Sequence, residues 1–237
     1  MYSVRPGSQE EQIGRLILSA MLVLFLPAIP LGNYLIYPFV ILSTWYHEMG
    51  HGLTALITGN QFEMLVLNSD GSGYAASRID GGVFDRALIA MGGPLGPSVI
   101  GALLILASSA RKYWKPALLA LAAALVLSTL IWVRSVIGWA VLPLIAAALA
   151  WTAWRGDDWL KRFALQFLGM LGALSMFSDL NYLFSESSVV GGQVMASDTG
   201  TMEAALFLPH WVWAVLIIAI SGLMIGASLK YALNREG

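Results

Sequence analysis

Residues 46–59 read YHEMGHGLTALITG and place His47, Glu48 and His51 within a largely apolar run. On a helix, side chains four residues apart lie on one face, one turn above the other. Both imidazoles can therefore reach one metal ion, with Glu48 beside the first of them. This is the HExxH arrangement, in which two histidines bind Zn²⁺ and the glutamate acts as general base on a water molecule. The motif predicts hydrolysis, because zinc lowers the pKa of bound water to about 7.

The same pattern also has a purely structural interpretation. A short motif can arise by chance, and a lone histidine in an apolar helix is usually a hydrogen-bonded core residue. Here, however, two of the three histidines in the chain fall in register with an acid between them. Ionisable groups are costly inside a membrane and tend to mark functional sites there. We therefore interpret the stretch as a metal site that holds one Zn²⁺ per chain.

The composition indicates the solvent in which this site works. Of the 237 residues, 58% are hydrophobic and only 11% are charged, whereas a soluble domain carries about 25% charged residues. The lipid bilayer is therefore the expected surrounding. The net charge of −1 and the absence of a basic run give no indication of a nucleic-acid partner. The chain has no cysteine, so any metal must be held by His, Asp or Glu.

Apolar runs of membrane-spanning length occupy most of the chain. A bilayer core requires about 20 mostly apolar residues per helix. By that rule we expect helices near 13–29, 33–58, 84–109, 116–133, 135–154, 159–184 and 208–230. Only VRSVIG separates the fourth from the fifth, so the prediction is six or seven spans, with seven favoured. The expected fold is an all-α integral membrane protein that forms a single membrane-embedded domain over residues 1–237.

Two connections are longer than the others. After the motif-bearing helix 33–58, the runs FEMLVL and GYAAS flank the turn-forming NSDGSG, which predicts a small β-hairpin over residues 61–77. Residues 185–207 contain three acids, no Lys or Arg, and a pair of glycines. We expect a polar loop in this second segment.

A zinc hydrolase site needs a third protein ligand. Asp179, in the expected helix 159–184, is the first candidate, because coordination would relieve the cost of a carboxylate at that depth. Asp198, in MASDTG, is the alternative metal ligand, although a helix N-cap or turn residue is the more ordinary reading of it. His210 reads as an interfacial residue at a helix start. Asn181 could contact substrate or a developing oxyanion, or equally bond across helices.

The chain resembles the site-2 protease family of intramembrane zinc metalloproteases. The resemblance rests on four features in order: HEMGH in a transmembrane helix, a following hairpin, a Gly-Pro-containing helix and a late intramembrane aspartate. The compact bacterial branch called B-type is the most similar. The resemblance implies that His47 and His51 bind zinc, that Glu48 is the catalytic base, and that Asp179 is the late ligand. It also implies a bacterial inner-membrane location, and a hairpin that offers a strand edge to an unwound substrate.

The chain departs from the family pattern in two places. The late aspartate usually stands in an LDG context, whereas Asp179 stands in FSDLNYLF, and the family's Gly-Pro-x-x-Asn appears here as GPLGP with Pro97 at the Asn position. The two indications of membrane orientation also disagree. The distribution of Lys and Arg favours a hairpin outside the cytosol, and the resemblance implies the reverse.

The leading functional hypothesis is an intramembrane zinc endopeptidase. It would hydrolyse a peptide bond in or near the transmembrane segment of a membrane-protein substrate. The alternative is a non-catalytic membrane protein that binds zinc, or a scaffold or transport protein. Transporters commonly show repeated halves with ionisable groups in corresponding spans, and the sequence shows no such repeat.

Overall fold

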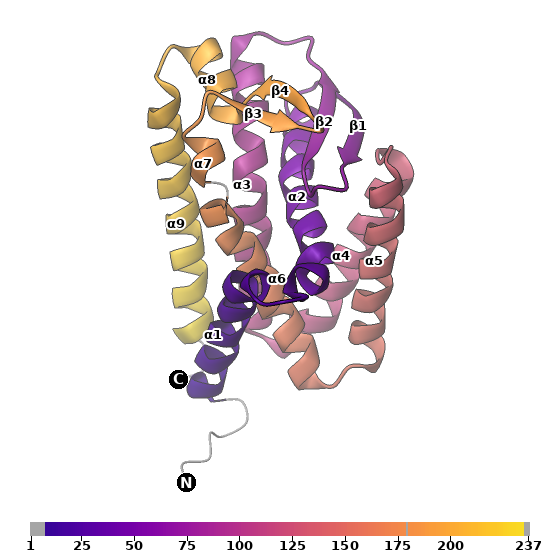
Figure 1. The fold of residues 1–237 in the computed structure, drawn as a ribbon. Helices are drawn as coiled ribbons and strands as arrows, with labels where there is room; N and C mark the ends of the chain where they lie inside the picture. The colour runs from indigo at the N-terminus through magenta and orange to yellow at the C-terminus, as the bar shows by residue number, and fades with distance from the viewer. Residues whose placement is uncertain (1–7, 179, 235–237) are drawn as a thin grey trace.

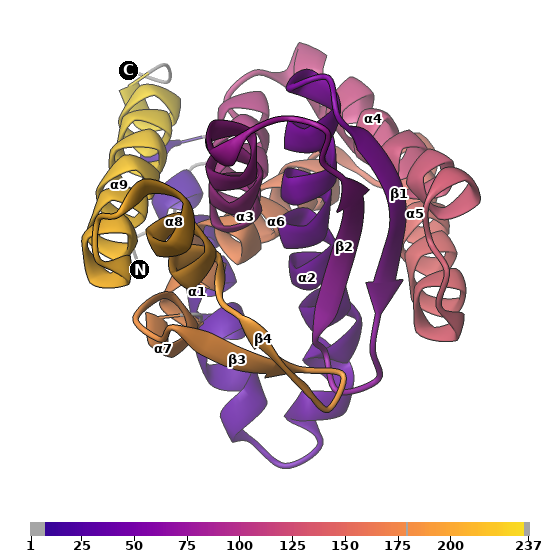
Figure 2. The same ribbon diagram turned by 90° about the horizontal axis from the view of Figure 1, so that it is seen from above.

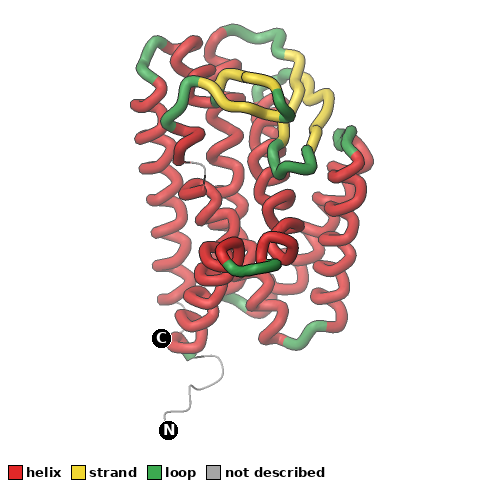
Figure 3. Tube along the Cα trace, viewed as in Figure 1, coloured by secondary structure: helices red, strands yellow, loops and turns green. Residues whose placement is uncertain are grey.

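The computed structural model describes residues 8–178 and 180–234. Long helices run side by side as a bundle, two small hairpins gather at one end, and the described chain begins and ends at the other (Figures 1 and 3). The long helices are α1 Gln9–Phe25, α2 Gly32–Ile57, α3 Val83–Ser108, α4 Arg111–Ile131, α5 Val136–Arg155, α6 Asp158–Ser178 and α9 His210–Asn234. The short ones are the 3₁₀-helix η1 Leu26–Ala28, α7 Leu180–Leu183 and α8 Asp198–Leu206.

Six helical segments in the described chain are long and apolar enough to cross a membrane. They are Gln9–Ala28, Val83–Ser108, Arg111–Ile131, Val136–Arg155, Asp158–Leu183 and His210–Asn234. The expected all-α membrane fold is therefore confirmed, with six spans. The expected span 33–58 corresponds to α2, which has 26 residues but is not among the six. Its second half carries the polar HExxH motif, which lowers its mean hydropathy.

The expected hairpin is present directly after α2. Strands β1 Gln61–Leu67 and β2 Gly73–Arg78 pair antiparallel, with Leu65 opposite Ala75. The outer edge of β1 is occupied by the connection between α4 and α5: the Leu65 N–H donates to the Trp132 carbonyl at 2.9 Å, and the Arg134 N–H donates to the Leu65 carbonyl at 2.9 Å. Within the described residues the other edge of β2 pairs with no strand, so it is the edge available to another chain.

The segment 185–207 is more ordered than the expected polar loop. It forms a second antiparallel hairpin, β3 Ser187–Val190 and β4 Gln193–Ala196, followed by α8. Gly191 and Gly192 make the turn at φ values of 57° and 81°, which favour glycine. Strands of four residues give too short an alternation to be recognised in sequence. The tips of the two hairpins lie side by side (Figure 2), and the Gly191 N–H donates to the Ser72 hydroxyl at 3.3 Å.

Glycines bring α2 and α3 close together beside the motif. A Cβ on Gly50 would collide with the Gly92 carbonyl oxygen, and a Cβ on Gly96 would meet the Tyr46 carbonyl oxygen. α3 continues as a helix through Pro94 and Pro97. On the other side of α2, Trp45 and its neighbours belong to the largest buried apolar cluster. The motif-bearing helix is thus fixed in the interior of the bundle.

Candidate metal centre

Helix α2 presents the two histidines of the motif to the same space. His47 and His51 lie one turn apart, with ring centroids 5.0 Å from each other and ring planes at 70°. Their side chains are only 15% and 13% exposed. The spacing of four residues therefore places both imidazoles on one face, as the sequence predicts.

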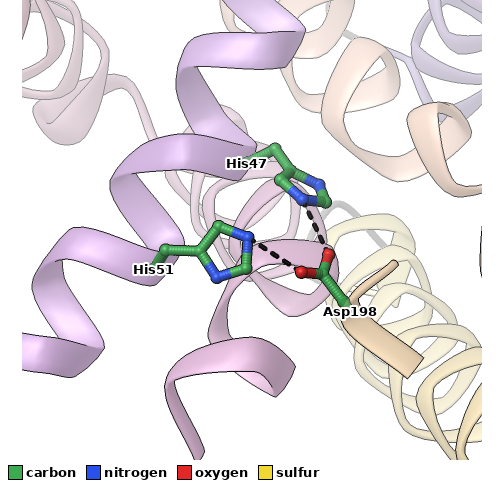
Figure 4. A group of neighbouring side chains, drawn as sticks. All are labelled: His47, His51 and Asp198. Carbon is green, nitrogen blue, oxygen red and sulfur yellow. Dashed lines mark hydrogen bonds and ion pairs between the residues drawn. The ribbon is translucent and has the colours of Figure 1, made fainter. Parts of the chain in front are cut away.

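Asp198, the first residue of α8, completes a three-residue group (Figure 4). Its Oδ2 lies 3.0 Å from Nε2 of His47, and its Oδ1 lies 3.2 Å from Nε2 of His51. The three ligand atoms lie within 4.8 Å of one another. Burial alone would raise the pKa of the Asp198 carboxyl, but the two imidazoles hold it below its usual range.

Hydrogen bonding to the backbone orients the second histidine. Nδ1 of His51 donates to the carbonyl oxygen of Ile89 in α3 at 2.7 Å. In a neutral imidazole the remaining nitrogen then carries a lone pair, and this Nε2 faces a carboxylate oxygen of Asp198. Two lone pairs repel each other at that distance unless a proton or a cation lies between them. A histidine held through its other nitrogen is the usual arrangement around a metal.

The donor set fits zinc in kind and in spacing. Two histidine nitrogens and one carboxylate are a common set of ligands in catalytic zinc sites. When the ligand bonds are about 2.0–2.1 Å long and meet at tetrahedral angles, two donor atoms lie about 3.3 Å apart. The observed nitrogen–oxygen separations of 3.0 and 3.2 Å are close to that value. Gly93 of α3 keeps the space clear, because a Cβ at this position would collide with Nε2 of His51.

Glu48 lies beside the group without joining it. Its side chain is buried, and the backbone of Ala75 in β2 is close to its carboxylate. Both residues line a cavity of about 300 Å³ that also reaches the three-residue group. The free edge of β2 and the hairpin β3–β4 contribute further to the wall, through Gly73, Tyr74, Ser77, Val190, Met195 and Ala196. The acid of the motif is therefore next to open space, at the edge of a strand.

The other residues singled out in the sequence fall in different places. Asp179 lies outside the described residues. Asn181 is exposed and does not line the cavity, whereas its neighbour Tyr182 does. The N-cap of α8 is Ser197 and not Asp198, since the Ser197 hydroxyl accepts the N–H of Gly200. Serine is a preferred N-cap residue, so the sequence signalled a helix start at Asp198, but it carried no local mark of a ligand.

A second group of possible ligands lies at the start of α9 and comprises Glu186, Glu203 and His210. The Glu203 carboxylate accepts both the backbone N–H of His210, at 2.8 Å, and its ring Nδ1, at 2.9 Å. The pKa of Glu203 is lowered by these contacts, the backbone bond first. The bond to the backbone gives an N–H group at the start of α9 the partner that the helix itself does not supply. The third member of the group, Glu186, is 77% exposed.

Comparison with known proteins gives a family for the chain. Residues 16–228 match the model of a family described as Peptidase M50B-like. No curated protein and no solved structure matched. The match spans most of the chain, including the motif, both hairpins and Asp198, and it agrees with the resemblance to site-2 proteases. An HExxH motif buried among six membrane-spanning segments, and a family match of this length, together show that the chain belongs to the M50B-like peptidases, of the site-2 protease family.

Proposed function

We propose that this protein is an intramembrane zinc endopeptidase, which hydrolyses a peptide bond in or near the transmembrane segment of a membrane-protein substrate. The observation that carries the proposal is the convergence of His47, His51 and Asp198 beside the buried Glu48. We assign the first three as zinc ligands and Glu48 as the general base. Membership of a peptidase family supports the same reaction class.

When bound, Zn²⁺ supplies Lewis-acid polarisation of the scissile carbonyl group and lowers the pKa of water. The chain's own residues handle the proton. The Glu48 carboxylate takes a proton from the attacking water as the new C–O bond forms, and returns it to the amide nitrogen as the C–N bond breaks. The products are one carboxylate and one amine. The buried setting strengthens these electrostatic interactions.

The free edge of β2 gives the substrate a place to lie extended. Gly73, Tyr74, Ala75 and Ser77 line the cavity together with Glu48. A helical peptide has to unwind before its bonds can be cut, and its backbone groups then need partners. Pairing with a strand edge supplies those partners. The substrate bond would thereby be held next to the base.

The variant Glu48→Gln tests this proposal. It removes the base, keeps the shape of the side chain and leaves the three proposed ligands in place. Purified wild type and variant would be assayed for zinc content, and for hydrolysis of synthetic single-span peptides in detergent micelles. We expect about one zinc in each protein, and hydrolysis slowed by about 10²–10⁴-fold in the variant.

Two outcomes would contradict the proposal. Equal hydrolysis by both proteins would refute the role of Glu48. A wild type that binds zinc and cleaves none of the peptides would favour the non-catalytic zinc-binding alternative.

A further inference from the structure

Tyr182 of α7 contacts two of the three residues in the metal centre. Its hydroxyl oxygen accepts the backbone N–H of Asp198 at 3.1 Å. Its ring lies edge-on to that of His47, with centroids 6.1 Å apart and planes at 75°. The same side chain lines the cavity in front of Glu48. Tyr182 therefore joins a residue of α8 to a residue of α2.

The bond to Asp198 falls at a point where the backbone needs a partner. Asp198 is the first residue of α8, and the first N–H groups of a helix have no acceptor within the helix. The aspartate side chain is short, so the position of its carboxylate follows the position of its backbone closely. A hydroxyl that holds this N–H consequently fixes the point from which the side chain starts and limits where the two carboxylate oxygens can lie.

Other bonds attach the first turn of α8 to the segment that precedes β3. The Thr199 hydroxyl donates to the Leu183 carbonyl at 2.8 Å, and the Ser197 N–H donates to the Glu186 carbonyl at 2.9 Å. These bonds hold the turn but involve neither Asp198 nor a histidine. In the described chain, Tyr182 is the residue whose hydroxyl bonds to Asp198 while its ring contacts His47.

We infer that Tyr182 is a positioning residue of the metal centre, which orients the Asp198 carboxylate through its hydroxyl and limits the movement of His47 through its ring. The inference rests on the proposed function, because it takes Asp198 and His47 as ligands of a divalent metal. Groups that orient metal ligands typically contribute 10- to 100-fold to metal affinity.

The test is the substitution Tyr182→Phe, which deletes the hydroxyl and keeps the ring. The matched control is Tyr74→Phe: Tyr74 lines the same cavity, and its hydroxyl makes no hydrogen bond within the described chain. Zinc affinity would be measured by competition with a chromophoric chelator, and the visible spectrum of the Co²⁺-loaded protein would report ligand geometry. We expect Tyr182→Phe to bind zinc 10- to 100-fold more weakly, with a shifted Co²⁺ spectrum. Tyr74→Phe should match the wild type in both.

A second variant separates orientation of the ligand from a general loosening of α8. Thr199→Val removes an attachment of the same turn without touching a proposed ligand. Equal losses of zinc affinity in Thr199→Val and Tyr182→Phe would overturn the inference, as would unchanged affinity and an unchanged Co²⁺ spectrum in Tyr182→Phe. Either result leaves the proposed function standing if the wild type binds zinc. A wild type that binds no metal would refute the proposed function itself.

Discussion

Gly93 of α3 lies directly against His51 of α2, so that a methyl group at position 93 would occupy the space next to Nε2 of the imidazole. The same methyl would also crowd Nε2 of His47. The metal centre thus depends on the absence of a side chain on a helix that contributes none of the three proposed ligands. Close packing of α2 on α3 fixes this geometry.

The first prediction follows from this contact. Gly93→Ala should abolish zinc binding, or weaken it by about 100-fold, because the methyl group displaces the imidazoles that need to converge. Zinc content and chelator competition measure the effect. Gly226→Ala in α9 is the matched control, since a Cβ there meets no atom of the described residues within 4 Å. Normal zinc binding by Gly93→Ala would show that the histidines do not hold metal in this arrangement.

The second prediction concerns the identity of the third ligand. Asp198→Ala should lose bound zinc, because it removes the carboxylate that lies 3.0 and 3.2 Å from the two imidazole nitrogens. Asp179→Ala, the change at the position first expected from the sequence, should retain about one zinc per chain. Metal analysis of the two purified variants side by side distinguishes the assignments. Zinc lost from Asp179→Ala but retained by Asp198→Ala would instead identify Asp179 as the third zinc ligand.

The third prediction concerns the edge of β2. If the substrate pairs with the edge of β2, every second backbone N–H of the substrate peptide points toward that strand. Methylating one of these substrate nitrogens removes a hydrogen bond worth about 1 kcal/mol, so the cleavage rate should fall roughly fivefold. Methylation of the next nitrogen along, which points away, should have a smaller effect. A series of singly N-methylated peptides, assayed for cleavage in micelles, measures this alternation. A uniform response along the series would argue against strand pairing.

The fourth prediction concerns the junction from which the hairpin β1–β2 leaves the bundle. Buried Asn60 donates to the side chains of Thr58 and Asp85 and accepts the backbone N–H groups of Asp80 and Gly81. Asn60→Ala leaves these groups without their partner and should lower the free energy of unfolding by about 2 kcal/mol. In a chain of this length that corresponds to a fall in Tm of about 4–8 °C.

A matched change in the hairpin turn provides the comparison. Asn68→Ala removes a single side-chain bond to Ser72 and should shift Tm much less. Thermal unfolding of both variants in the same detergent measures the difference. Equal Tm values for the two variants would show that Asn60 does not hold the junction.

Much of the protein could be predicted from local patterns. The apolar runs correspond to seven long helices, and the turn NSDGSG does separate two paired strands. Most helix ends lie within four residues of those expected, but α4 begins five residues earlier and α6 ends six residues earlier. HExxH places His47 and His51 on one face because a helix repeats every 3.6 residues. These features depend on neighbours in sequence, so the sequence by itself determined them.

The partners of the motif depend on contacts between distant segments, and only the tertiary structure decided them. Asp198 lies 151 positions after His47, and nothing in MASDTG distinguishes a metal ligand from an ordinary residue at a helix start. Its approach to the histidines follows from how α8 is attached to α7 and how the glycines let α3 pack against α2. Such long-range packing leaves no periodic trace in a sequence, because each contact is set by the three-dimensional fit of side chains and not by their spacing along the chain.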